Sequence, residues 1–297
     1  MPRLLFSSLR TRAAWRLQRL EVWDASRASS WGIERRPELS QHFLRHGAAA
    51  ALVRRLGYPR GSLVVEAGAG DGALTAALLS GGLRVVAVER DARLYARLVA
   101  RLGRDARLTC VLADFLTVAL PAEPYRVVSN APYGVTAALA RKLLEAARPP
   151  EEAVLVVQRE AAEKFAGVPR TTLFSLLHAP WSEITIAGTV RRRDFVPAPR
   201  VRSAILRIRQ RPTALIDEAS AGRYRALVRA AFGNGSGDVS RALRGHATAA
   251  QVRRLGRDLG FEPHAGPGRL TFGQWLAVFR FVEHECLGHD PTWRVAA

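Results

Sequence analysis

The feature that most constrains the fold is an alternating pattern in residues 40 to about 210. Short apolar runs rich in β-branched residues alternate there with stretches of helical character. Two parallel strands need a crossover, usually helical, so this alternation is typical of a parallel α/β sheet. The sequence therefore predicts a doubly wound, Rossmann-like sheet. Its parallel strands are expected at 63–66, 85–89, 109–114, 127–130 and 154–158.

The pattern changes towards the C-terminus. Apolar runs at 184–190 and 203–208 are joined by a loop without a clear helix, so we expect an antiparallel pair at one edge of a seven-stranded sheet. Beyond Pro212 the strand signal disappears, and Thr248 with Gln251 and Thr271 with Gln274 match capping boxes. We therefore predict a basic extension at 1–36, an α/β domain at 37–211, and a small helical domain with a tail at 212–297.

The charge balance indicates a polyanionic partner. The chain has 45 Lys and Arg against 26 Asp and Glu, a formal net charge of +19, and a basic excess of this size favours nucleic acid. Its only lysines are Lys142 and Lys164, and arginine suits bidentate phosphate contacts. A GC-rich genome would also favour arginine codons. The extension is either an RNA-gripping tail or an organelle transit peptide, since both are rich in arginine and poor in acids.

Cysteine usage and hydropathy bear on location. Cys110 and Cys286 lie far apart and form no disulfide framework, and no apolar run is long enough to span a bilayer. We expect a cytoplasmic protein without a membrane partner. His284 to His289 match no usual zinc spacing, so no metal is expected.

Four of the predicted parallel strands end in a polar residue. They are Glu66, Glu89, Asp114 and Asn130. Ligands of open α/β sheets bind outside the carboxyl ends of the strands, so the four side chains are expected to share one crevice. A single one could be a solvated strand end, but four in register favour a site.

The first strand runs into a glycine-rich turn at 66–72, with the sequence EAGAGDG. Gly68 and Gly70 allow the backbone to approach a ligand closely. Glu66 and Asp71 would repel a dinucleotide pyrophosphate, which disfavours a nicotinamide dehydrogenase, but they tolerate the cationic S-adenosylmethionine. Glu89 is placed to accept hydrogen bonds from the ribose hydroxyls and Asp114 one from the adenine amine.

The fourth strand end, Asn130 to Tyr133, indicates chemistry. An adenine amine is a poor nucleophile, and acceptors for both N–H groups would favour an attacking, pyramidal nitrogen. The Asn130 amide oxygen and the Ala131 carbonyl are the candidate acceptors, Tyr133 would stack on the base, and Pro132 removes a competing donor. The alternative is an ordinary Asn-Pro turn.

These motifs together resemble the ribosomal RNA adenine N6-methyltransferases, over about residues 38 to 285. The resemblance is carried by SQHFL at 40–44, EAGAGDG, Glu89, Asp114, NAPY at 130–133, DFVPAPRV at 194–201 and LTFGQWL at 270–276. Two branches compete: the erythromycin-resistance (Erm) family, acting on 23S rRNA, and the dimethyladenosine transferases, acting on 16S rRNA. NAPY resembles the Asn-Ile-Pro-Tyr form of the Erm family more than the Asn-Leu-Pro-Tyr-Asn of the other branch, and LTFGQWLAVF resembles its C-terminal signature.

The resemblance implies roles for individual residues. His42 and Leu44 would contact the cofactor, Gly68 would lie against its amino-acid part, and Phe195 would hold the target base opposite Tyr133. Packing of its own loop is the alternative for Phe195. The sequence departs from the family pattern at two positions. His42 stands where the family usually has Asn, and Ala131 stands where Ile or Leu is commoner.

The sequence thus leads to a specific expectation: a Rossmann-like class I methyltransferase with a mainly parallel seven-stranded sheet and a C-terminal helical RNA-binding domain. By resemblance, a monomer would use S-adenosylmethionine to add one or two methyl groups to an adenine N6 in 23S rRNA before full ribosome assembly. Macrolide, lincosamide and streptogramin B resistance would follow. The alternatives are a 16S rRNA dimethyladenosine transferase, a DNA adenine methyltransferase and a non-catalytic nucleic-acid-binding relative.

Overall fold

A computed structural model describes residues 42–130, 132–233 and 237–286. These residues belong to one compact unit, 35–297. The predicted extension at 1–36 lies outside the described residues, as do Ala131 and the C-terminal residues from 287 onwards.

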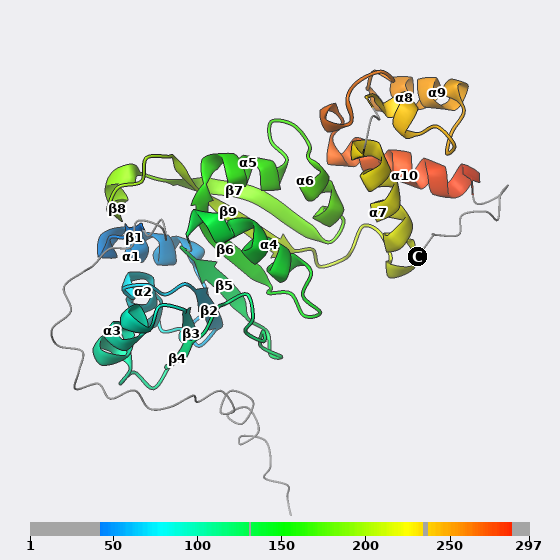
Figure 1. Ribbon diagram of the computed structural model, residues 1–297. Coiled ribbons are helices and arrows are strands. Elements are labelled where there is room, and N and C mark those ends of the chain that lie inside the picture. Colours follow the sequence, from blue (N-terminus) through cyan, green and yellow to red (C-terminus); the bar gives the residue numbers. More distant parts are fainter. Residues whose placement is uncertain (1–41, 131, 234–236, 287–297) are drawn as a thin grey trace, which may run out of the picture. The chain divides into compact units, whose positions relative to one another are not determined.

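One seven-stranded sheet carries the fold (Figure 1). Its order is β4-β3-β2-β5-β6-β9-β7, and β2 to β6 run parallel. The edge pair predicted from the sequence is confirmed, because β9 is antiparallel to both β6 and β7. The strands are β2 (Leu63–Ala67), β3 (Arg84–Glu89), β4 (Leu108–Leu112), β5 (Arg126–Ser129), β6 (Glu152–Gln158), β7 (Ser182–Val190) and β9 (Ser203–Gln210).

Valine-rich runs form the central strands because helices cover both faces of a doubly wound sheet. From the boundary between β2 and β5, the chain adds β3 and β4 on one side and β6 on the other. Because crossover connections are right-handed, the helices of the two halves lie on opposite faces of the sheet. Helices α1 (His46–Leu56), α2 (Ala73–Ser80) and α3 (Ala92–Leu102) share a core with one face. Figure 1 shows α4 (Thr136–Leu144) near β5 and β6, and α5 (Arg159–Ala166) near β7 and β9.

A second core lies in the helical region after β9. It is built on the fully buried Trp275 and Tyr224, and it includes Leu176 of α6, with Trp181 packed against it. Residues 173–181, in the predicted α/β domain, therefore help to build this helical core. Its helices are α6 (Leu173–His178), α7 (Glu218–Phe232), α8 (Val239–Ala242), α9 (Ala249–Leu259) and α10 (Phe272–Cys286).

Both predicted capping boxes are present. Thr248 and Gln251 exchange side-chain hydrogen bonds with each other's backbone N–H at the start of α9, and Thr271 and Gln274 do the same at α10. These bonds satisfy N–H groups that the first helical turn leaves unpaired.

A two-stranded sheet formed by β1 (Phe43–Leu44) and β8 (Phe195–Val196) has no counterpart in the sequence-based expectations. The strands run antiparallel, with Leu44 opposite Phe195. The pair fastens the segment before α1 to the connection between β7 and β9. No helix in the described ranges is both long and apolar enough to cross a membrane.

Candidate active site

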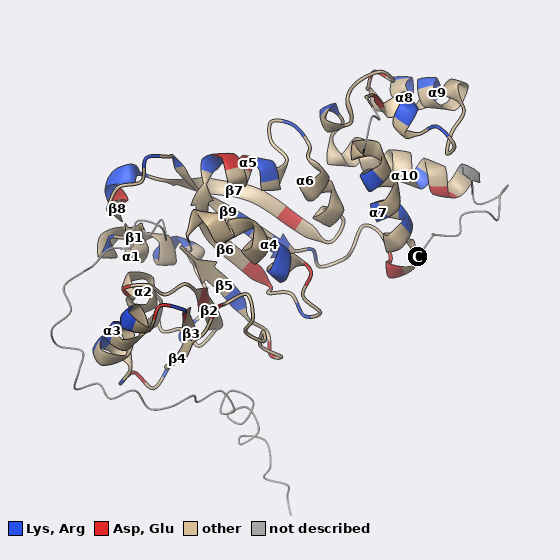
Figure 2. Cartoon of the chain, viewed as in Figure 1, with Lys and Arg blue, Asp and Glu red and all other residues tan. Residues whose placement is uncertain are grey.

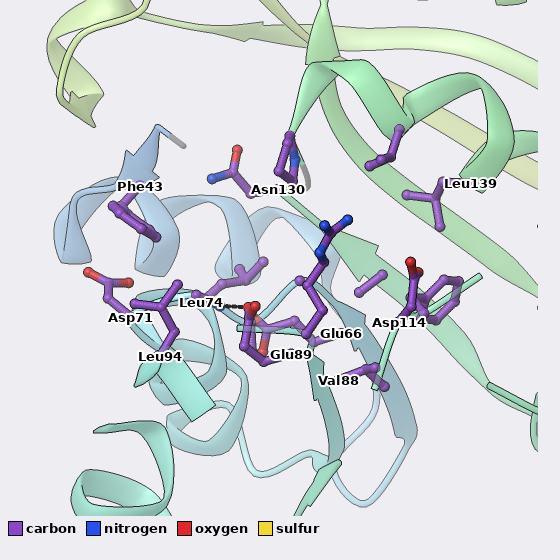
Figure 3. A pocket seen from close by; sticks show the side chains of 18 of the residues that line it. Phe43, Glu66, Asp71, Leu74, Val88, Glu89, Leu94, Asp114, Asn130 and Leu139 are labelled. Atoms are coloured by element: carbon purple, nitrogen blue, oxygen red, sulfur yellow. Dashed lines mark hydrogen bonds between the residues drawn. The ribbon is translucent and has the colours of Figure 1, made fainter. Parts of the chain in front are cut away.

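The carboxyl ends of the parallel strands open onto one pocket (Figure 3). Figure 3 shows the side chains of Glu66, Glu89, Asp114 and Asn130 around the same space. All the predicted site residues within the described ranges line this pocket, except Phe195. They are His42, Leu44, Glu66, Gly68, Gly70, Glu89, Asp114, Asn130, Pro132 and Tyr133.

The glycine-rich turn has a backbone that larger residues would not tolerate. Gly68 and Gly70 have positive φ values of 75° and 58°, in a region that favours glycine. A Cβ on Gly70 would also stand 2.8 Å from the Phe43 ring. The Gly70 N–H donates to Glu89 Oε2 over 2.8 Å, which joins the turn to the end of β3.

Glu89 is the last residue of β3 and is buried. Its Oε1 accepts a 2.8 Å hydrogen bond from the Asp91 N–H, so each carboxylate oxygen already holds one backbone amide. Burial raises the pKa of Glu89, although these backbone hydrogen bonds oppose the rise. A carboxylate oxygen can accept more than one hydrogen bond, so Glu89 keeps capacity for a donor in the pocket.

Glu66 lies within β2 and is only 1 % exposed, so it is not a solvated strand end. Among the described residues, one side chain forms a hydrogen bond with Glu66. The Thr75 hydroxyl donates to Oε2 over 2.6 Å. Burial raises the pKa of Glu66 to about 8, and the nearby Glu89 and Asp71 add to the rise. No salt bridge reaches it within the described ranges. A positively charged ligand would therefore stabilise its ionised form.

Asp114 lies further out than expected. Strand β4 ends at Leu112, so Asp114 belongs to the following turn and is exposed. Its Oδ1 accepts a 2.9 Å hydrogen bond from the Leu116 N–H, which orients the carboxylate at the rim of the pocket.

Asn130 directly follows β5, and its amide has a defined orientation. Nδ2 donates to the His42 carbonyl oxygen over 2.8 Å. A carbonyl can only accept, so this bond assigns the amide nitrogen to the His42 side and leaves Oδ1 available as an acceptor.

The residues around Asn130 form a linked group. The Tyr133 hydroxyl shares a 2.7 Å hydrogen bond with Ser203 Oγ, and the Tyr133 ring centroid lies 5.8 Å from that of His42. The ring Nδ1 of His42 lies 3.0 Å from the Pro197 carbonyl, to which it must donate. The sequence analysis did not identify Ser203 or Pro197, because neither belongs to a motif with a polar strand end.

Phe195 was expected to hold the target base opposite Tyr133. Its side chain is 1 % exposed, packs in the α/β core and does not line the pocket. The residue also pairs with Leu44 in the β1–β8 sheet. The packing of Phe195 is therefore observed, and its contact with a target base stays a prediction.

Two other expectations stay predictions. Within the described ranges no group of three or more His, Cys, Asp or Glu could hold a metal ion, and most of the 284–289 segment lies outside those ranges. The backbone acceptor expected at Ala131 also lies outside them.

The family model described as "Ribosomal RNA adenine dimethylase" matches residues 33–282. The chain is 35% identical to the mycinamicin-resistance protein MyrB of Micromonospora griseorubida, over 87% of this chain and 83% of that protein. It is 37% identical to an rRNA adenine N-6-methyltransferase of Streptomyces fradiae, over 82% of this chain and 78% of that protein. Among solved structures, the 23S rRNA methyltransferase ErmE superposes with a TM-score of 0.75 and 32% identity, covering 81% of this chain and 99% of that one.

Proposed function

The chain belongs to the ribosomal RNA adenine dimethylase family, and from that membership we propose that it methylates the N6 atom of a specific adenine in 23S rRNA. S-adenosylmethionine is the methyl donor, and the modification confers resistance to macrolides, lincosamides and streptogramin B. The observation that carries the proposal is the gathering of Glu66, Glu89 and Asn130 in one pocket of a fold shared with ErmE.

The pocket suits the methyl donor. When bound, S-adenosylmethionine supplies an electrophilic methyl group on a cationic sulfur. Glu89 would accept hydrogen bonds from the ribose hydroxyls, Asp114 would accept one from the adenine amine, and the Gly68 backbone would leave room for the amino-acid part. A cationic ligand would stabilise the ionised form of the buried Glu66, whereas a pyrophosphate would oppose its ionisation, which separates this pocket from one that binds a dinucleotide. His42 and Leu44 complete the wall on the β1 side.

The second part of the pocket holds the substrate amine. Asn130 Oδ1 would accept one N6–H, and the Ala131 carbonyl is the expected acceptor of the other. The amine nitrogen would then form its bond to the methyl group as the S–CH3 bond of the donor breaks, and the amine would release one proton to solvent. Tyr133, held by Ser203, stacks on the extruded base, and Pro132 presents no competing N–H. Alignment and hydrogen bonding carry the reaction, and no residue needs to form a covalent bond.

The finer features of the proposal rest on charge and on the family resemblance. A net charge of +19 suits an RNA substrate that ribosomal proteins do not yet cover. We therefore propose that the enzyme acts in the cytoplasm before ribosome assembly is complete. Residues 212–297 supply an RNA-binding surface, the active form is a monomer, and the product carries one or two methyl groups.

The proposal is tested by transfer of labelled methyl groups to protein-free 23S and 16S rRNA, comparing wild type with Asn130→Ala. We expect labelling of 23S rRNA, and a fall in kcat of about a hundredfold or more in the variant, since it lacks a hydrogen bond that strengthens in the transition state. Binding of S-adenosylmethionine, measured by calorimetry, serves as the control for an intact pocket.

Each outcome has a distinct meaning. Labelling confined to 16S rRNA would move the chain to the dimethyladenosine transferases of the small subunit and keep the chemistry. Cofactor binding without labelling of either RNA would overturn the proposal and favour a nucleic-acid-binding relative. Full activity of Asn130→Ala would remove Asn130 from the reaction.

A further inference from the structure

Helix α4 carries two basic residues in its last turn, Arg141 and Lys142 (Figure 2). Their surroundings differ, because the Arg141 side chain is exposed whereas Lys142 is half-buried. Lys142 and Lys164 are also the only lysines of a chain that otherwise uses arginine. The contacts of Lys142 account for an ammonium group at this position.

The Lys142 ammonium holds the turn that follows β4. Its Nζ donates to the Phe115 carbonyl oxygen over 2.6 Å and to the Val118 carbonyl oxygen over 2.5 Å. The same atom lies 5.0 Å from the centroid of the Phe115 ring, whose face attracts a cation. An ammonium has three donors on one compact atom, so it can serve two carbonyls that converge on one point, which a planar guanidinium matches less well.

The same turn carries Asp114, the acceptor proposed for the cofactor adenine. The Leu116 N–H donates to Asp114 Oδ1 over 2.9 Å, and the Thr117 N–H donates to the Asp114 carbonyl oxygen over 3.0 Å. The position of the exposed Asp114 carboxylate therefore depends on the turn, and the turn is held by Lys142. Burial lowers the pKa of Lys142 and the charge of Asp114 opposes this effect, which agrees with their closeness.

Lys142 joins segments from two separate strands of the sheet. The turn follows β4 and helix α4 follows β5, and β3 and β2 lie between those two strands. Leu139 stands three residues before Lys142, on the same face of α4, and lines the pocket. Figure 3 shows Leu139 and Asp114 on the same side of the pocket. The hydrogen bonds of Lys142 therefore connect the cofactor side of the crevice with the helix that begins just after Tyr133.

We propose that Lys142 is a positioning residue that holds the Asp114 carboxylate where it can accept the adenine amine of S-adenosylmethionine. The inference rests on the proposed function. Lys142 is not among the described residues that line the pocket, so it acts through the turn at 114–118 and not through a contact with the ligand. Selection of adenine over a base without the amine thus depends on a side chain outside the pocket wall.

The test measures, by calorimetry, the binding of two ligands to the full-length protein without RNA. One is S-adenosylhomocysteine, and the other is its analogue with hypoxanthine in place of adenine, which presents a carbonyl oxygen to Asp114. Wild type should prefer the adenine ligand by about tenfold or more, since the analogue cannot donate to the carboxylate. Lys142→Met keeps a side chain of similar length without the ammonium. Its Kd for S-adenosylhomocysteine should rise about tenfold, and its preference should fall to about twofold or less.

Two further measurements separate positioning from general support of the fold. In an Asp114→Ala background, Lys142→Met should raise the Kd for S-adenosylhomocysteine by less than about twofold, because effects that act through one shared residue are not additive. In the ligand-free protein, the backbone amides at 116–118 should exchange with deuterium about tenfold faster in Lys142→Met than in wild type. Lys164→Met is the matched control, because Lys164 is the other lysine and is exposed on α5, and it should leave both Kd values unchanged.

A rise in Kd that is the same for both ligands, with the preference for adenine kept, would overturn the inference, since Lys142 would then support the pocket without positioning Asp114. Amide exchange at wild-type rates, or a full effect of Lys142→Met in the Asp114→Ala background, would overturn it as well. These results differ from a failure of the proposed function, in which the wild type itself would bind neither ligand.

Discussion

Two buried glutamates of the same sheet have opposite surroundings. Glu66 lies near the carboxyl end of β2. Among the residues that the structure describes, the Thr75 hydroxyl is its one side-chain hydrogen-bond donor, and burial raises its pKa to about 8. Glu152 begins β6 at the amino end of the parallel strands and is 4 % exposed. It accepts hydrogen bonds from Tyr58, Arg207 and Arg209. Burial acts to raise its pKa too, but these partners outweigh burial, so the pKa is lowered.

The comparison distinguishes the carboxylate of Glu152, which stabilises the fold, from that of Glu66, which lacks a charged partner within the described residues and lies in a ligand pocket. A buried charge is costly unless it is paired, and at Glu152 the chain supplies the partners itself. At Glu66 the missing partner has to come from outside. The two ends of the sheet should therefore respond differently to substitution, one through stability and the other through pH and ligand binding.

The largest effect is expected from Glu66→Gln at alkaline pH. Below pH 4.5 both folded and unfolded wild type are protonated at this position. Between pH 4.5 and 8 only the unfolded chain ionises, so wild type loses about 1.4 kcal/mol of stability per pH unit. Glutamine mimics the protonated acid and avoids this loss. In urea unfolding across this pH range, the free energy of unfolding of the variant should increase relative to that of wild type as pH rises.

Glu123→Gln is the control for that series, because Glu123 pairs with Arg84 at the surface. Parallel stability curves for Glu66→Gln and wild type would show that Glu66 is ionised in the folded protein, and the contrast with Glu152 would disappear.

Glu152→Ala should have the next largest effect. Removing the carboxylate leaves Arg207 and Arg209 without their buried acceptor, and we expect a loss of about 3 kcal/mol in the free energy of unfolding. Cofactor affinity should not change. Glu123→Ala removes an exposed partner and should cost less than about 1 kcal/mol. Similar losses for the two variants would mean that the network at the amino end contributes no more than a surface ion pair.

The smallest of the three effects is expected for Glu89→Gln. Neutralising the acceptor weakens its hydrogen bonds to the ribose by about 2 kcal/mol, so the Kd for S-adenosylmethionine should rise by about thirtyfold. The amide oxygen can still accept from the Gly70 N–H, but the amide nitrogen cannot accept from the Asp91 N–H, so the lost Asp91 bond contributes to the rise in Kd. Calorimetry measures the Kd, and an unchanged value would remove Glu89 from the cofactor site.

The sheet was predictable because its strands are continuous runs of valine and other apolar residues, bounded by turns. The crevice was predictable for the same reason, since Glu89 and Asn130 interrupt apolar runs where the strands end. The surroundings of Glu66 were not predictable, because a local motif does not show which distant hydroxyl meets a carboxylate. The Glu152 network likewise depends on the register of β6 and β9, which places Glu152 opposite Arg209.

The β1–β8 pair and the position of Phe195 also escaped the sequence analysis. Each strand has only two residues, so no periodicity marks them. A phenylalanine in a proline-rich loop near the pocket is compatible with base stacking and with core packing. Its burial in the core and its pairing with Leu44 could be seen only in the structure.

The β1–β8 pair has a consequence for the newly synthesised chain. His42 contacts Pro197 across 155 residues, and its carbonyl also holds the Asn130 amide. A nascent chain that has emerged only as far as β6 contains the glycine-rich turn and Asn130, but the loop that fastens His42 has not yet been translated. Because domains fold from the N-terminus during synthesis, the methyl-transfer site is completed only late in translation. Until then, the ribosome that makes this protein is not exposed to a finished rRNA-modifying site on its own nascent chain.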